Sequence, residues 1–268
     1  MKQAYLLYSE ADAATNQAFI KQLRQAGLQH NVQLTLLIEE QHDIINETSD
    51  ALFIWNRTRN AAIAKQLEQL GRRVINRSEV NFIANDKLRA MQLAILQGVP
   101  TVPRILEQHL ADEHFPLIVK STSGHGGSEV FKCDTREEFE QAKAKLDNYL
   151  IEPYIDTKAS DVRVWMIGET IIGAVKRTGA PGDFRSNYTL GGSIEKFDLN
   201  AEQRDYVERI QKAIKSDYIG IDFLHVTRDH LLFNEMEDPV GARSYYELFD
   251  EDLTGLLWQH LLKKADTL

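Results

Sequence analysis

The chain has 268 residues, 43% of them hydrophobic and 26% charged, which is the composition of a folded globular protein rather than a disordered one. No apolar run approaches the roughly 18 residues of a membrane span, and the single cysteine, Cys133, excludes an internal disulfide. A single cysteine fits a cytoplasmic protein, and without a long apolar run we expect no membrane partner. The net charge of −9 argues against nucleic acid as the main partner.

The first part of the chain alternates short apolar runs with stretches of helical periodicity. The apolar runs predict strands at residues 5–8, 32–38, 51–55 and 73–75. Hydrophobic residues at helical spacing predict helices between them, at residues 19–26 and 60–71. Uninterrupted apolar strands are typical of a buried parallel sheet, so this region is expected to form a small α/β layer.

The pattern changes after a helix that is expected to begin at Asp86 and to end before Gly98. Strands are then predicted at residues 101–106, 115–121, 128–132 and 149–155. Thr135 and Glu138 have the spacing of a capping box and predict the start of a further helix. Two hairpins are predicted at residues 162–176 and 218–237, and two more helices at 207–214 and 253–261. The run of antiparallel strands indicates an α+β fold for this larger part of the chain.

A glycine-rich segment follows Lys120 at the end of one predicted strand. It includes Gly124, Gly126 and Gly127, and glycines let backbone N–H groups approach anionic oxygens while a lysine supplies a point charge. The segment is a candidate phosphate-binding loop, with a flexible hairpin turn as an equal alternative on the residues alone. It matches neither the Walker pattern nor the dinucleotide fingerprint, which ranks a nucleotide-cofactor dehydrogenase last among the functions considered.

Three acidic residues are expected to converge on the second hairpin. Asp222 lies within an apolar strand, where an unpaired charge is costly. Glu235 and Glu237 share one face of the returning strand, and a turn near Arg228 brings Asp222 about level with Glu235. Such carboxylates repel one another unless a hard cation lies among them, and Mg²⁺ prefers oxygen ligands. The alternative is a solvent-facing edge that carries scattered acids.

Basic residues gather on the first hairpin and shortly after it, at Arg163, Lys176, Arg177 and Arg185. Arginine binds phosphate or carboxylate groups bidentately, although arginines on a hairpin are most often surface residues. A phosphate loop, a carboxylate cluster and a group of arginines together are what phosphoryl transfer from a magnesium nucleotide requires.

These residues resemble the motifs of the ATP-grasp ligases, in an order and spacing similar to the RimK-like and glutathione-synthetase-like branch. The resemblance is carried by residues 86–88, 115–127, 152–155, 160–164, 183–187, 191–192, 220–222 and 234–237. It implies an ATP-grasp fold, with two α+β subdomains gripping ATP, preceded by a small Rossmann-like α/β domain. The boundaries we expect are residues 1–84 for the first domain and 85–268 for the second, whose lid subdomain covers about 101–155 and whose C-terminal subdomain covers about 156–268.

The resemblance also implies a role for individual residues. The residues expected to bind the nucleotide are Lys87, Lys120, Gly124, Gly126, Gly127, Glu152, Pro153, Tyr154, Asp161 and Asn187. Among them, Glu152 to Tyr154 would be the hinge that meets adenine and Asp161 would lie near the sugar. Arg177 and Arg185 would steady the phosphate and the reacting acyl group. Asp222, Glu235 and Glu237 would be the metal ligands.

Two features depart from the family pattern. The family usually reads Glu-x-Asn at the last metal position, where this chain has Glu237, and the extra carboxylate could change metal affinity or the number of ions. Residues 238–243 also differ from the usual segment beside the substrate, which leaves the acceptor open. Arg243 is a candidate contact for a substrate carboxylate, with an ordinary surface arginine as the alternative.

The function implied is an ATP-dependent carboxylate–amine ligase that forms an amide or peptide bond through an acyl phosphate and releases ADP and phosphate. ATP and one or two Mg²⁺ ions are expected, with Mn²⁺ as an alternative. The substrates would be a small-molecule carboxylate and an amine, such as an amino acid or peptide, and a homodimer is the default oligomer. Two rival hypotheses are a non-catalytic ATP-binding regulatory module of the same fold and a phosphotransferase.

Overall fold

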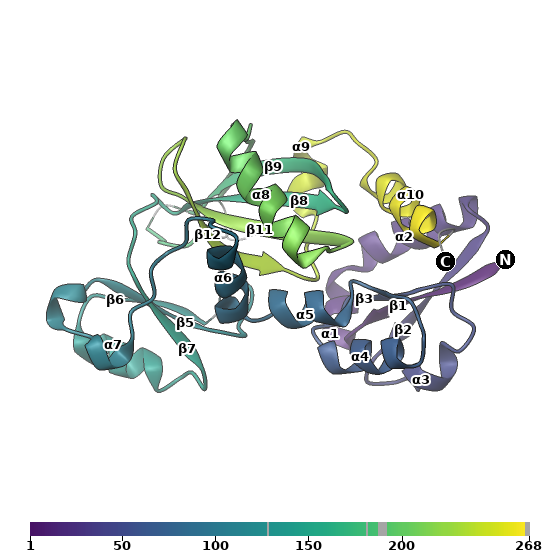
Figure 1. Ribbon diagram of the computed structural model, residues 1–268, viewed down its shortest axis with the longest axis horizontal. Coiled ribbons are helices and arrows are strands. Elements are labelled where there is room, and N and C mark those ends of the chain that lie inside the picture. Colours follow the sequence, from purple (N-terminus) through teal and green to yellow (C-terminus); the bar gives the residue numbers. More distant parts are fainter. Residues whose placement is uncertain (128, 181, 187–191, 266–268) are drawn as a thin grey trace.

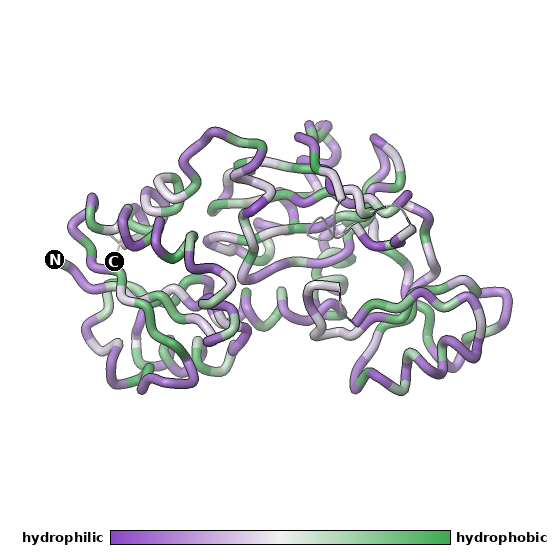
Figure 2. Tube along the Cα trace, turned by 180° about the vertical axis from the view of Figure 1, so that it is seen from behind, coloured by the Kyte–Doolittle hydropathy of each residue, from purple (hydrophilic) through white to green (hydrophobic). Residues whose placement is uncertain are grey.

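The computed structural model describes residues 1–127, 129–180, 182–186 and 192–265. Three sheets follow one another along the long axis of the molecule, with a five-stranded sheet between a four-stranded and a three-stranded one (Figure 1). The most hydrophobic stretches of the chain run along the strands, and the connecting loops are mostly hydrophilic (Figure 2). This arrangement confirms the predicted α+β fold.

The four-stranded sheet has the order β2-β1-β3-β4, and all its strands are parallel, as predicted. Its strands are β1 (Lys2–Tyr8), β2 (Val32–Ile38), β3 (Ile54–Asn56) and β4 (Val74–Ile75). Its helices are α1 (Glu10–Thr15), α2 (Gln17–Gln29), α3 (Ile44–Glu47) and α4 (Ala61–Gln69). The C-terminal helix α10 (Leu253–Ala265) returns to pack on α2, where Trp258 Nε1 donates to Leu23 O at 2.9 Å. The last helix therefore shares the core of the first sheet.

The five-stranded sheet is antiparallel and has the order β10-β9-β8-β11-β12. Its strands are β8 (Ser160–Ile167), β9 (Thr170–Thr178), β10 (Ser193–Lys196), β11 (Tyr218–His225) and β12 (Leu231–Glu237). Every residue of β8 is buried, because helices cover one face of the sheet and the N-terminal layer meets the other. Val162, Val164 and Met166 pack beneath α6 (Lys87–Leu96) and α8 (Ala201–Ile214). The alternate residues, among them Arg163 and Trp165, point to the opposite face.

The three-stranded sheet is antiparallel and has the order β6-β5-β7. It contains β5 (Leu117–Ser121), β6 (Val130–Cys133) and β7 (Tyr149–Pro153), with α7 (Arg136–Lys143) packed against it. Thr135 caps α7 by accepting from Glu138 N, but the Glu138 carboxylate accepts from Asp134 N, so the predicted capping box closes one residue earlier than expected.

The strand predicted over residues 101–106 is wrong. Thr101 forms one isolated bridge with Phe233, and short 3₁₀ turns η1 (Glu107–His109) and η2 (Asp112–His114) follow. Pro100 and Pro103 lack the N–H that a strand ladder needs, which explains the interruption. Helices α5 (Ser78–Ala84) and α9 (Arg243–Leu248) were not predicted.

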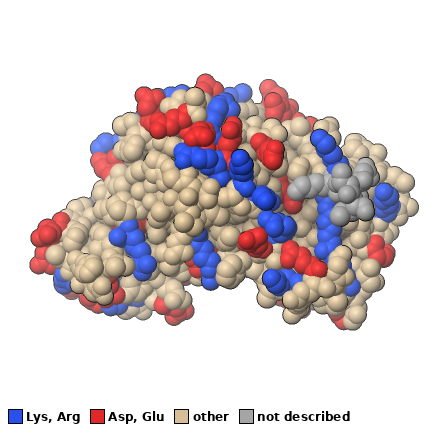
Figure 3. Space-filling model, viewed as in Figure 1, with Lys and Arg blue, Asp and Glu red and all other residues tan. Residues whose placement is uncertain are grey.

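Acidic and basic side chains are interspersed on the face shown in Figure 3. Across the part of the chain that the structure describes, no helix has the length and apolar character needed to cross a bilayer.

Candidate active site

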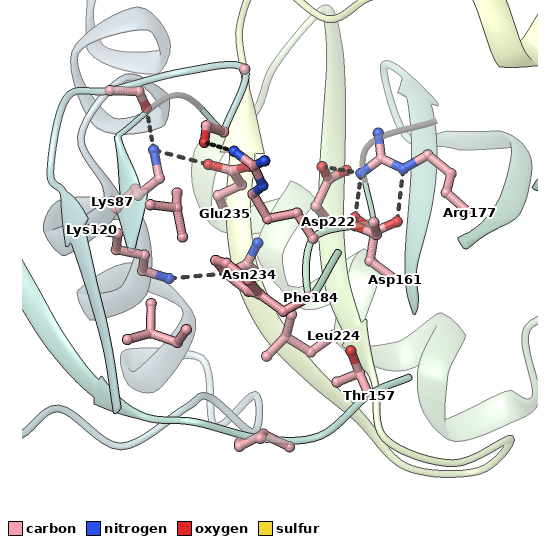
Figure 4. Close-up of a pocket in the computed structure, with 18 of the residues that line it drawn as sticks. Lys87, Lys120, Thr157, Asp161, Arg177, Phe184, Asp222, Leu224, Asn234 and Glu235 are labelled. Atoms are coloured by element: carbon pink, nitrogen blue, oxygen red, sulfur yellow. Dashed lines mark hydrogen bonds and ion pairs between the residues drawn. The ribbon is translucent and has the colours of Figure 1, made fainter. Parts of the chain in front are cut away.

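A cleft lies between the three-stranded and five-stranded sheets, and Figure 4 shows the side chains that point into it. We call it the central cleft. Sequence-predicted residues that line it are Lys87, Lys120, Gly124, Gly126, Gly127, Pro153, Tyr154, Asp161, Arg177, Arg185, Asp222, Glu235 and Glu237. The fold thus brings together residues that are far apart in sequence. Asn187, also predicted here, lies outside the described residues.

Two buried lysines stand on one side of the central cleft (Figure 4). Lys87, the first residue of α6, lies 3.1 Å from Glu235 Oε2 and donates to the carbonyl of Gly124. Lys120 Nζ on β5 lies 2.8 Å from Glu152 Oε2 and 3.0 Å from Asn234 Oδ1. Glu152 does not line the cleft itself but holds the side chain of Lys120, which does. The sequence did not reveal this role of its side chain.

The glycine-rich segment covers this side of the cleft. Gly126 and Gly127 have φ values of +69° and +75°, which L side chains rarely adopt. A Cβ on Gly124 would lie 2.3 Å from Glu129 Oε2. Arg185 Nη1 donates to Gly127 O at 3.1 Å, which ties the segment to the opposite side of the cleft. Arg185 also pairs with Asp183 at 2.9 Å.

The three predicted metal ligands meet where β11 pairs with β12. Asp222 is directly opposite Glu235, where the hairpin pattern predicted the two to be about level. One carboxylate oxygen from each of Asp222, Glu235 and Glu237 lies within 4.8 Å of the other two. This all-oxygen donor set fits a hard divalent cation. Burial raises the pKa of Glu237. Arg163 opposes this shift, but the neighbouring acids Asp222 and Glu235 reinforce it, so the pKa of Glu237 remains raised.

Two arginines, the buried Arg163 and the mostly buried Arg177, surround Asp222. Arg163 binds it through Nε at 2.8 Å and Nη2 at 2.6 Å, and the same Nη2 lies 2.5 Å from Glu237. Arg177 forks between Asp161, at 2.6 and 2.7 Å, and Asp222, at 2.8 Å (Figure 4). Burial alone would raise the pKa of Asp222, but the two arginines lower it to about 2. Asp222 is therefore ionised at neutral pH.

The remaining wall of the cleft is apolar. Ile118, Val130, Ile155, Phe184 and Leu224 line it beside Tyr154, and such a surface suits a flat aromatic ring. The N–H of Tyr154, one of the predicted hinge groups, already donates to Pro116 O at 3.1 Å. Arg243 is exposed at the start of α9 and lines neither this cleft nor the cavity beside it.

The sequence model of the RimK-like ATP-grasp domain matches residues 80–255. The chain belongs to the RimK-like ATP-grasp family. The matched segment begins before Lys87 and ends after Glu237, so it includes every site residue named above.

Relatives of known sequence agree with this membership. A probable alpha-L-glutamate ligase of Serratia proteamaculans is 30% identical over 76% of this chain and 72% of its own length. An uncharacterised protein, MG011 of Mycoplasma genitalium, is 25% identical over 98% of this chain and 93% of its own.

A solved structure shows the same fold. D-alanine–D-alanine ligase from Bacillus anthracis, complexed with ATP, has a TM-score of 0.73 at 16% identity, covering 100% of this chain and 98% of that one. The predicted ATP-grasp fold is confirmed, and the prediction that the chain is an ATP-grasp ligase is confirmed at the level of its family.

Proposed function

We propose that the chain is an ATP-dependent carboxylate–amine ligase that forms an amide bond through an acyl phosphate. The observation that carries the proposal is the convergence, in one cleft, of two lysines, a glycine-rich loop, the cluster of three carboxylates and three arginines. Phosphoryl transfer depends mainly on such positioning and charge stabilisation. Membership of the RimK-like family, which includes proteins named as ligases, supports the same reaction class.

In the proposed complex, ATP lies along the central cleft. Its adenine would lie against the apolar wall near Tyr154, and its phosphates would lie beside Lys87, Lys120 and the glycine-rich loop. Asp222, Glu235 and Glu237 would hold Mg²⁺, which when bound neutralises phosphate charge. One or two ions, and Mn²⁺ in place of Mg²⁺, remain predictions, as do a homodimer and a cytoplasmic location.

The reaction has two steps. A carboxylate oxygen of the first substrate attacks the γ-phosphorus, the bond to the β–γ bridging oxygen breaks, and ADP leaves. The amine of the second substrate then attacks the acyl carbon, phosphate leaves with its electron pair, and the amine loses a proton to solvent. Arg185 and Arg177 would stabilise the anionic oxygens, and the loop that Arg185 contacts would exclude water from the acyl phosphate.

L-Glutamate is the first amine substrate to test, because a relative at 30% identity is named a probable alpha-L-glutamate ligase. Wild-type protein is incubated with Mg-ATP, L-glutamate and pools of amino acids, dipeptides and small carboxylic acids. ADP, free phosphate and a product whose mass equals both substrates less one water are expected.

The same assay separates the two rival functions. A phosphorylated product without free phosphate would indicate a phosphotransferase. Nucleotide binding without ADP release in any pool would indicate a non-catalytic module and would contradict the proposal. The residues of the cleft favour the ligase, because a module that only senses ATP has no need of Arg185 or of three carboxylates.

A further inference from the structure

A second cavity adjoins the central cleft, between the four-stranded and five-stranded sheets. Its walls include Tyr8, Arg57 and Arg59 from the first domain and Asp238 from the segment after β12. We call it the intersheet pocket. It shares lining residues with the central cleft, among them Lys87, Glu235 and Glu237. A molecule bound in this pocket therefore lies next to the carboxylate cluster.

The topology of the first sheet places this pocket where a ligand is expected. Tyr8 is the last residue of β1, and Arg57 directly follows β3. In the order β2-β1-β3-β4, the connection after β1 leads to one edge of the sheet, at β2, and the connection after β3 leads to the other edge, at β4. In open parallel sheets, ligands bind at the carboxyl ends of the strands, at this point of reversal. Tyr8 and Arg57 lie before residue 80, where the family match begins.

Arg57 is a buried cation that forms no ion pair with a carboxylate of the described residues. The residue is 3% exposed, Nη2 donates to Val240 O at 2.8 Å, and Nε is buried without a hydrogen bond. Four aromatic rings lie 5.3–5.9 Å from the guanidinium carbon and hold it in place. Within the described ranges, no carboxylate is at ion-pair distance from Arg57, whereas Arg59 pairs with Asp12 at 2.8 Å.

The polar groups beside Arg57 do not supply the ion-pair partner that it lacks. The carboxylate of Asp238 accepts from the amides of Asn76 and Asn81, at 3.0 and 3.1 Å. The buried hydroxyl of Tyr8 lies beside the Arg57 guanidinium, which opposes the rise that burial causes in its pKa, and no acceptor for its proton is found among the described residues. Buried donors are normally paired, so the Arg57 Nε–H and the Tyr8 O–H, which both lack an acceptor, indicate that a ligand supplies one. A carboxylate would supply both a negative charge to pair with Arg57 and an acceptor for the hydroxyl proton of Tyr8.

We propose that the intersheet pocket binds the amine substrate, an amino acid whose carboxylate is received by Arg57 and Tyr8. The inference rests on the proposed ligase function, because it identifies the second substrate of that reaction. A carboxylate paired with Arg57 serves as an anchor and is distinct from the carboxylate that is phosphorylated. The amine of the same molecule faces the adjoining central cleft.

The test combines binding and kinetics. Each of the twenty L-amino acids is titrated by calorimetry into the wild-type protein with Mg-ADP, and each one that binds is compared with its carboxamide. Binding of at least one amino acid is expected, with its carboxamide at least about tenfold weaker, because the carboxamide cannot pair with Arg57. Absence of binding by all twenty, or equal binding of acid and carboxamide, would overturn the proposal.

Two variants and one matched control locate the site. Arg57→Lys and Tyr8→Phe should each raise the dissociation constant and KM of that amino acid about tenfold or more, with kcat and the KM of ATP nearly unchanged. Tyr218→Phe should change neither, because Tyr218 is also a buried tyrosine with an unpaired hydroxyl beside Arg57 but does not line the pocket. Tyr8→Phe removes one oxygen, so it remains informative if Arg57→Lys fails to fold.

The outcomes separate this inference from the ligase proposal. If the protein turns over and Tyr8→Phe does not change the KM of the amino acid, the ligase proposal stands and the proposed role of the intersheet pocket is overturned. If Tyr8→Phe weakens amino-acid binding but no ADP is released, the intersheet pocket stands as an amino-acid site and the ligase proposal is overturned.

Discussion

Asp222 in the central cleft and Asp238 in the intersheet pocket are two aspartates of equal burial, with 1% and 3% of their surface exposed. Burial disfavours the charged form of both. Arg163 and Arg177 reverse this effect at Asp222 and lower its pKa to about 2. The Asp238 carboxylate accepts from the neutral amides of Asn76 and Asn81, and burial raises its pKa to about 6 although Arg57 and Arg59 act at a distance in the opposite direction.

The two cavities therefore differ in how far their buried charges are paired. In the central cleft, lysines and arginines already have carboxylate partners, so the cleft is electrostatically balanced before a nucleotide arrives. In the intersheet pocket, Arg57 and Asp238 are both buried, yet the ion pairs of the described residues do not include either. The first arrangement suits a site that exchanges partners during phosphoryl transfer, and the second suits a site completed by a charged substrate.

The strongest way to break this comparison is Asp222→Asn. The substitution leaves Arg163 and Arg177 short of a buried anion, so the free energy of unfolding should fall by about 3–5 kcal/mol. It also removes a proposed metal ligand, and kcat should fall about 1,000-fold. Urea denaturation and ADP release measure the two effects. Asp229→Asn, in the exposed turn of the same hairpin, is the control and should change unfolding by less than about 0.5 kcal/mol.

Arg185→Ala tests the chemistry without a large structural cost. Arg185 is one third exposed, so stability should change little, while loss of a charge near the reacting acyl group should lower kcat about 100-fold. ATP binding, measured by calorimetry, should survive. Unchanged turnover would remove Arg185 from the mechanism.

Lys120→Met tests whether the lysine binds nucleotide or only pairs with Glu152. The single variant leaves a buried carboxylate unpaired and should lose about 3 kcal/mol of stability. The double variant Lys120→Met with Glu152→Leu should recover most of that loss, because an apolar pair replaces a buried ion pair. The KM of ATP should stay raised by about tenfold or more in both variants. Full recovery of ATP affinity in the double variant would show a purely structural lysine.

The pH dependence of stability sharpens the comparison. The folded pKa of Asp238, about 6, lies above its ordinary value of 3.8, so the folded state holds the proton more tightly and stability falls as pH rises between about 4 and 6. The lowered pKa of Asp222 has the opposite sign, and its contribution is lost only as pH falls toward 2. The stability of the wild type relative to Asp238→Asn should fall by about 1–3 kcal/mol from pH 4 to pH 7. A constant difference across this range would contradict the raised pKa.

Some of this architecture could be predicted from residues alone. The β11–β12 hairpin predicted that Asp222 lies about level with Glu235, because strand register follows from a turn and alternating faces. The exact pairing also needs the register shift between Asp222 and Phe223, which the sequence did not reveal. The partner of each charge could not be predicted, since Arg163 meets Glu237 and Lys120 meets Glu152 only after distant strands pack together. The intersheet pocket left no local signal either, because Tyr8, Arg57 and Val240 come from three separate parts of the chain.

The acyl phosphate is the central claim, and oxygen transfer tests it most directly. A carboxylic acid substrate identified in the ADP-release assay is labelled with ¹⁸O in its carboxylate and incubated with Mg-ATP, the amine substrate and the enzyme. If the carboxylate attacks the γ-phosphorus, one labelled oxygen must leave with the phosphate, and mass spectrometry of that phosphate should show one ¹⁸O per amide formed. Amide formation accompanied by unlabelled phosphate would contradict the account.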